Sequence, residues 1–190
     1  MDTGLLSPPT VLPPYVQVTG RSGPRHSVIH PTLGYMFLVS ELDSTVSWFE
    51  LDKASGNITY IRSLSTLPPP YDATGMAAAE IQCSPDGSFI YVSNRDISDP
   101  NQYRSSISVY SINPSSGALS YLQTVSSVGI HPRHFDLTEK FMLIANKDSD
   151  NIVVMDIHHT GILNEDNLIP DMIFKHEYLK SPTQVLIVDF

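Results

Sequence analysis

The chain has 190 residues, of which 41% are hydrophobic and 16% are charged, so it can bury the core of about one domain and is not a disordered sequence. Lys and Arg number 11 against 20 Asp and Glu, and the resulting net charge of -9 disfavours partners such as nucleic acid or an anionic membrane surface. One cysteine, Cys83, excludes an internal disulfide.

Residues 1–16 are expected to form an irregular, proline-rich N-terminal segment. They contain two proline pairs and an early acid, Asp2, but no basic cluster followed by a long apolar run, so we expect no secretory signal. No later apolar run approaches the roughly 20 residues that cross a bilayer. The sequence therefore predicts a cytoplasmic protein with no membrane partner, whose folded part covers residues 17–190.

Three segments of the chain resemble one another: 30–41, 84–95 and 136–147. Each has a turn and an apolar run that ends in a charged residue, and these residues (Glu41, Arg95 and Lys147) are 54 and 52 positions apart. A second apolar strand, a Ser-Gly or Thr-Gly turn and a third strand follow; in the first two repeats the third strand is expected at 57–61 and 118–122.

A period of about 50 residues with short antiparallel strands is typical of β-propeller blades. A β-sandwich or a short β-solenoid is the alternative. Because propellers have about 4–8 blades, the chain is expected to form an all-β, partial ring of about three to four blades, each a four-stranded antiparallel sheet.

Short motifs occupy matching places in the repeats: Gly23-Pro24-Arg25-His26, Ser40-Glu41-Leu42-Asp43, Ala79-Glu80-Ile81, Ser84-Pro85-Asp86-Gly87, Ser93-Asn94-Arg95 and His131-Pro132-Arg133-His134. In combination they resemble the lactonase family of seven-bladed propellers, which includes 6-phosphogluconolactonases and carboxy-cis,cis-muconate cyclases. The resemblance begins near Gln17 and implies the C-terminal half of such a propeller, with residues 181–185 as its closing strand. It also implies that a family active-site histidine belongs to the other half.

By this resemblance, Arg25, Glu41 and Arg95 match the functional positions of the family and are predicted to be catalytic. Glu41 would act as general base on a water molecule. The two arginines would hold an anionic group and stabilise the oxyanion that forms at a lactone carbonyl. The alternative is that these charges form ion pairs between blades, because structural ion-pair networks also gather charged residues at strand ends.

Three further residues, His26, Glu80 and Arg133, are predicted to bind substrate. In the repeat register His26 and Glu80 lie just before an inner strand, and a packed histidine bonded to a backbone carbonyl is the alternative for His26. Arg133 and His134 repeat the Arg25-His26 pattern, and at most one copy is expected to face substrate. No histidine pair has a recognised metal-binding spacing, so no metal and no cofactor are expected.

The predicted function is hydrolysis of a sugar-acid lactone, with a small anionic lactone or sugar acid as the partner. One alternative is a muconate cycloisomerase-like activity. Another is a truncated, non-catalytic propeller fragment that binds a ligand or associates with itself through open blade edges. Whether the chain is an enzyme is therefore left open by the sequence, while Cys83 and Trp48 are expected in the core.

Overall fold

The computed structural model describes residues 15–18, 20–70, 72–98, 104–164, 173–174 and 180–188. Within these residues the strands form three four-stranded antiparallel sheets, and the short 3₁₀ helix η1 spans Lys147–Ser149. The strands are β1 (Pro24–Ile29), β2 (Tyr35–Ser40), β3 (Thr45–Leu51) and β4 (Ile58–Ser65) in the first sheet; β5 (Met76–Cys83), β6 (Phe89–Asp96), β7 (Ser106–Ile112) and β8 (Leu119–Ser126) in the second; and β9 (Pro132–Leu137), β10 (Phe141–Asn146), β11 (Asn151–Asp156) and β12 (Ile173–Phe174) in the third.

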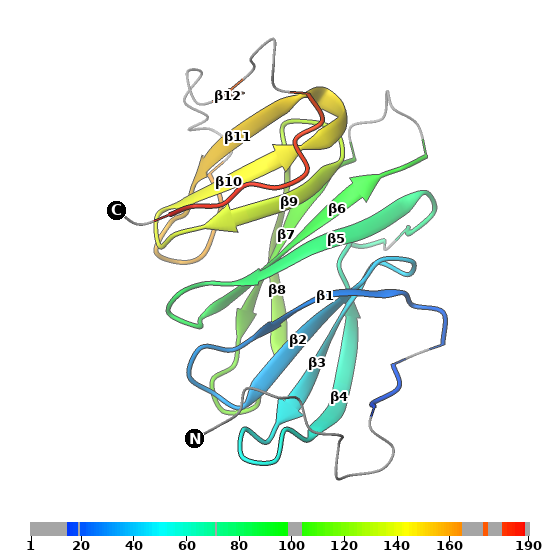
Figure 1. The fold of residues 1–190 in the computed structure, drawn as a ribbon, viewed down its shortest axis with the longest axis vertical. Coiled ribbons are helices and arrows are strands. Elements are labelled where there is room, and N and C mark those ends of the chain that lie inside the picture. The colour runs from blue at the N-terminus through cyan, green and yellow to red at the C-terminus, as the bar shows by residue number, and fades with distance from the viewer. Residues whose placement is uncertain are drawn as a thin grey trace, which may run out of the picture.

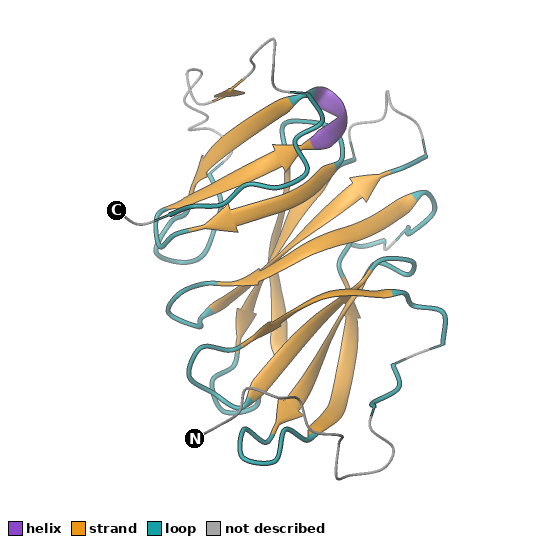
Figure 2. Cartoon of the chain, viewed as in Figure 1, coloured by secondary structure: helices purple, strands orange, loops and turns teal. Residues whose placement is uncertain are grey.

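Each strand pairs with the next one along the chain, so every sheet is an up-and-down meander. The first strands of the sheets, β1, β5 and β9, contact one another in turn and form a common inner edge (Figure 1). Loops join the strands almost throughout (Figure 2). Sheets that fan out from a shared inner edge are the blades of a propeller, which confirms the predicted all-β, partial-propeller fold.

The innermost strand of each blade is the one that the sequence pattern described least well. His26 and Glu80 lie within β1 and β5, whereas the repeat register placed them just before an inner strand. The segment β1 has no apolar run, because its side chains border the open inner edge and four of its six residues are exposed. The predicted third strands at 57–61 and 118–122 are longer than expected, and they correspond to β4 and β8.

The turn between the first two strands of each blade is held by one side chain. The equivalent residues are His30, Ser84 and Thr138, and their Nδ1, Oγ and Oγ1 atoms each accept hydrogen bonds of 3.0–3.2 Å from two backbone amides of the turn. Such local acceptors satisfy turn amides that no strand partner reaches. An imidazole and two hydroxyls thus perform the same task in three copies of one motif.

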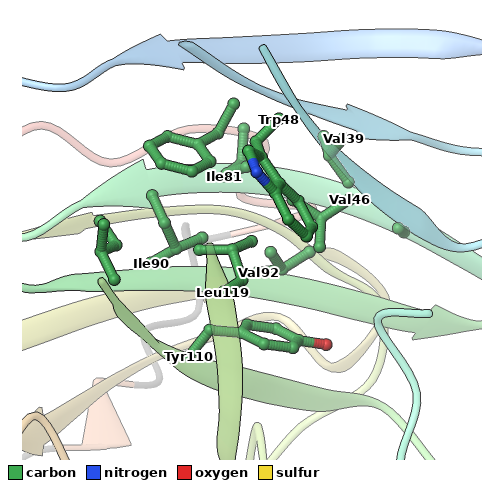
Figure 3. Close-up of a cluster of buried hydrophobic side chains, with 11 residues drawn as sticks. Val39, Val46, Trp48, Ile81, Ile90, Val92, Tyr110 and Leu119 are labelled. Atoms are coloured by element: carbon green, nitrogen blue, oxygen red, sulfur yellow. The ribbon is translucent and has the colours of Figure 1, made fainter. Parts of the chain in front are cut away.

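Two hydrophobic clusters fill the spaces between the blades. The first lies between the first two sheets and the second between the last two. Figure 3 shows the first cluster, in which the indole of Trp48 from β3 lies beside Ile81 from β5. Trp48 is only 4% exposed, which confirms its predicted place in the core.

Two buried asparagines join the second strands of the later blades to the connections that precede those blades. Asn94 in β6 donates from Nδ2 to the Thr66 carbonyl at 3.0 Å, and Asn146 in β10 donates in the same way to the Ser127 carbonyl at 3.0 Å. Each asparagine immediately precedes a charged residue of the repeat, Arg95 or Lys147. The backbone is therefore fixed where these charged side chains begin.

The segment 180–188, which contains the closing strand expected at 181–185, runs beside β9 but is not a strand (Figure 1). Its amides bond to side chains instead of to a backbone ladder. The Ile187 amide donates to Asp136 Oδ2 at 2.7 Å, and the Val185 amide donates to His134 Nδ1 at 3.5 Å. The N-terminal segment 1–14 lies outside the described residues, so the domain boundary at residue 16 stays a prediction.

Cys83 at the end of β5 packs against the first cluster, as expected. Burial raises the pKa of its thiol to about 12, and the nearby charge of Asp86 adds to this rise. We expect the thiol to remain protonated at pH 8 and to react much more slowly with a disulfide reagent such as DTNB in the folded chain than after unfolding in urea. Equal rates in the two states would contradict this burial.

Candidate functional site

The structure brings the three predicted catalytic residues together at the inner edge of the first two blades. Glu41, in the turn after β2, accepts a hydrogen bond of 2.7 Å at Oε1 from Nη2 of Arg95 in β6. Nε of Arg25, in β1, lies 3.8 Å from Glu41 Oε2. The carboxylate is thus placed between two guanidinium groups that belong to neighbouring blades.

Arg95 is almost fully buried, and its donors are directed inward. Nε donates to the Ala77 carbonyl at 3.3 Å, and Nη2 donates to the Ala78 carbonyl at 3.1 Å as well as to Glu41. A buried guanidinium needs this number of partners, because each unpaired donor costs free energy away from water. Arg95 is therefore a rigid support for the carboxylate of Glu41, whose side chain is 37% exposed and accessible from the inner edge.

The electrostatic surroundings keep Glu41 ionised. Burial on its own would raise the pKa of this carboxyl, but the hydrogen bond from Arg95 and the charges of Arg95, Arg25 and Arg133 outweigh it and hold the pKa below its usual value. A carboxylate with a lowered pKa is charged at neutral pH and is a weaker base than a free one.

Arg25 lies near the positive charges of Arg95 and Arg133. Burial lowers its pKa, and the charges of Arg95 and Arg133 contribute further lowering, which Glu80 and Glu41 oppose. Its Nη1 donates to the Ala79 carbonyl at 2.7 Å. This bond ties β1 to β5.

A second group joins the inner strands of all three blades. His26, Glu80 and His134 occupy equivalent positions in β1, β5 and β9. Glu80 Oε2 lies 2.9 Å from Nδ1 of His26 and 3.5 Å from Nε2 of His134, and Oε1 accepts from the Ile81 amide at 3.1 Å. Because Glu80 is only 5% exposed and both of its oxygens are engaged, this group links the three inner strands through buried polar contacts.

Arg133 differs from the other arginines of this region. It lies on β9 near enough to influence the pKa values of Arg25, Glu41 and His131 electrostatically. Within the described part of the chain, no hydrogen bond or ion pair engages its side chain, which is only partly buried. A guanidinium in this state is available to an anionic ligand.

His131, which sequence reasoning did not select for the site, extends the network beyond Arg95. Its Nε2 lies 3.3 Å from Arg95 Nη1, and its Nδ1 lies 3.0 Å from Oδ2 of Asp148 in η1. The available signal was the repeat itself, since His131 takes the place that Gly23 has before Pro24.

Among the residues that the structure describes, no three His, Cys, Asp or Glu side chains form a group suited to a metal ion. The same part of the chain contains no helix with the length and apolar character that a membrane span requires.

Three blades with a shared inner edge of Arg, Glu and His side chains define a β-propeller protein with a polar site at its axis. The model of a family described as "Lactonase, 7-bladed beta-propeller" matches residues 2–168. The chain therefore belongs to this lactonase family.

Curated relatives agree with this assignment. The chain is 38% identical over 141 residues to the 6-phosphogluconolactonase of Formosa agariphila, a match that covers 73% of this chain and 37% of the relative. It is 32% identical over 137 residues to the 6-phosphogluconolactonase of Bacillus subtilis, which covers 71% and 37%. This chain thus spans less than half the length of these relatives.

Solved structures share the fold. A Bacteroides fragilis protein superimposes with a TM-score of 0.76 at 24% identity, covering 92% of this chain and 44% of that one. The periplasmic gluconolactonase of Pseudomonas aeruginosa superimposes with a TM-score of 0.72 at 25% identity, covering 88% and 43%.

Proposed function

We propose that this chain provides the Arg25, Glu41 and Arg95 part of a site that hydrolyses a sugar-acid lactone, with 6-phosphogluconolactone as the first substrate to test. The observation that carries the proposal is the Glu41 carboxylate, partly exposed and placed between guanidinium groups of two blades. The names of the matched relatives support the choice of substrate. We also propose a cytoplasmic location.

In this mechanism Glu41 accepts a proton from water as the water oxygen forms a bond to the lactone carbonyl carbon. The carbonyl electron pair moves onto its oxygen, and the positive charges of Arg25 and Arg95 stabilise that oxyanion. When the carbonyl re-forms, the ring C–O bond breaks and the ring oxygen takes the proton from Glu41, which restores the Glu41 carboxylate. The products are a hydroxyl group and a carboxylic acid, and the acid releases its proton to solvent to give the open sugar acid.

Arg133 is proposed to hold the anionic group of the substrate, because its guanidinium has no partner among the described side chains. Glu80 and His26 are proposed to contribute indirectly, since the hydrogen bond between them joins the inner strands that carry Arg25 and Ala79. Of the three predicted substrate-binding residues, Arg133 is thus proposed to contact the substrate, and Glu80 and His26 are proposed to support the site.

Replacing Arg133 with Gln tests this proposal directly. We expect 6-phosphogluconate to bind about 10- to 100-fold more weakly, because a charge-assisted hydrogen bond is lost while the length of the side chain is nearly kept. Isothermal titration gives the dissociation constant, and the chain's hydrolysis of 6-phosphogluconolactone is followed in parallel. Arg62→Gln on β4 is the matched control and should bind like the parent chain. Equal affinity in the two variants would refute the role of Arg133.

The second candidate function is an anion-binding module without turnover. The ion pairs of Glu41 favour it, because they lower the pKa and hence the basicity of the carboxylate. A chain that binds 6-phosphogluconate but never hydrolyses the lactone would support this candidate. Self-association through open blade edges stays a prediction, tested by the mass of the purified chain in solution.

A further inference from the structure

The backbone at His131 adopts a conformation that residues with side chains rarely take. Its φ is 63°, in the left-handed region, where a Cβ atom is crowded. At the equivalent position in the first blade stands Gly23, with φ 70°. The two residues make the same bond, since the Gly23 carbonyl accepts from the Glu41 amide at 2.8 Å and the His131 carbonyl accepts from the Lys147 amide at 3.0 Å. The third blade thus carries an imidazole where the first has glycine.

Hydrogen bonds to neighbouring segments hold the loop around His131. A left-handed backbone at a residue with a side chain persists where surrounding contacts of this kind enforce it. The His131 amide donates to Ser105 Oγ at 3.3 Å. The Ile130 amide donates to Ser149 Oγ at 2.9 Å, and the Ile130 carbonyl accepts from the Asp148 amide at 3.1 Å. These hydrogen bonds join the helix η1 to the loop, so the backbone that carries the His131 imidazole is fixed.

The contacts of the imidazole define its tautomer. Asp148 accepts from Nδ1, so Nδ1 carries the hydrogen, and Nε2 has a free lone pair. Arg95 Nη1 lies 3.3 Å from Nε2 and donates to this lone pair. Burial lowers the pKa of His131, and the charges of Arg95, Lys147 and Arg133 lower it further against the opposing effect of Asp148, so the ring stays neutral.

We propose that His131 is a positioning residue, which with Asp148 fixes the guanidinium of Arg95 so that Arg95 presents Glu41 and its own charge to an anionic ligand. The contacts form the continuous series Asp148, His131, Arg95 and Glu41, which crosses from the third blade to the first. Of the four Arg95 contacts, the one with His131 is the only side-chain contact from the third blade within the described residues. The ligand part of this inference rests on the proposed function, but the positioning part does not.

Three variants separate positioning from simple structural support. His131→Asn suits the left-handed backbone well, because Asn adopts this region more readily than most residues, but its amide is too short to reach Arg95. His131→Gln places an acceptor oxygen near the position of Nε2 and should restore the contact. His159→Gln, an exposed histidine in the turn after β11, is the matched control.

The first measurement is NMR of the Arg95 guanidinium and of the histidine ring nitrogens in the intact chain. We expect hindered rotation of the Arg95 Nη groups in the parent chain, faster rotation in His131→Asn, and hindered rotation again in His131→Gln. The His131 ring should show hydrogen on Nδ1 and none on Nε2. Unchanged Arg95 rotation in His131→Asn, or hydrogen on Nε2, would overturn the proposal whatever the ligand.

The second measurement is titration with 6-phosphogluconate. His131→Asn should weaken binding about tenfold, the scale of one hydrogen bond to a charged group, and His131→Gln should recover most of the loss. Failure of the parent chain to bind 6-phosphogluconate would reject the proposed function and leave the NMR result to decide the role of His131. If His131→Asn binds 6-phosphogluconate more weakly and His131→Gln does not recover the affinity, His131 does not act through Arg95. That result would also overturn the proposal.

Discussion

Replacing Glu41 with Gln should lower the rate of 6-phosphogluconolactone hydrolysis by about 10²- to 10⁴-fold, the usual contribution of a general base. Binding of 6-phosphogluconate should change little, because the amide keeps the shape of the carboxylate and can still accept from Arg95. Turnover is measured in a chimera in which this chain replaces the matched part of the Bacillus subtilis relative.

Glu50→Gln is the matched control for this experiment, since Glu50 on β3 is an exposed glutamate away from the inner edge. It should leave turnover and binding unchanged. Full activity of Glu41→Gln in the chimera would remove the base assignment, and Glu41 would then be an ion-pair partner that joins two blades.

Replacing Phe135 with Ala should lower the free energy of unfolding by about 3–5 kcal/mol, which is typical for removal of a buried aromatic ring. Phe135 on β9 is fully buried in the cluster between the second and third blades. Its loss leaves a cavity lined by side chains from both sheets, including Tyr91 and Met142. Urea denaturation followed by circular dichroism gives the midpoint and the slope from which this free energy is obtained.

Phe141→Ala provides the comparison, because the ring of Phe141 on β10 is 40% exposed and loses less contact. We expect its effect to remain below about 1 kcal/mol, since surface substitutions rarely exceed this. Similar shifts in the two variants would show that the second and third blades do not share a packed interface.

The repeat predicted the blades because apolar strands that are buried on both faces leave a clear pattern. The segment 89–95 and its copies have this pattern, since β6 is buried almost throughout. The inner strand β1 did not, because four of its six residues are exposed at the open inner edge. In β1 the residues Arg25 and His26 are placed by pairing with β2 and by contacts with β5, which sequence periodicity alone does not reveal.

The meeting of Glu41 and Arg95 could be predicted, because equivalent strand ends of adjacent blades lie side by side. The pairing of His26 with Glu80 follows from the same 54-residue offset. Asp148 could not be predicted as the partner of His131, because their contact depends on a short helix and on a left-handed backbone at one residue. The left-handed backbone recurs at Gly23 in the first blade, but within the described residues the short helix has no counterpart in the first two blades.

The turn acceptors His30, Ser84 and Thr138 also differ in how far they reach. The hydroxyls of Ser84 and Thr138 donate only within their own turns, to Asp86 Oδ1 and to the Phe141 carbonyl. An imidazole has a second ring nitrogen on its far side, and in His30 this nitrogen donates to the Gly87 carbonyl at 2.9 Å in the next blade. The same turn motif therefore closes one blade on itself in two copies and fastens one blade to its neighbour in the third.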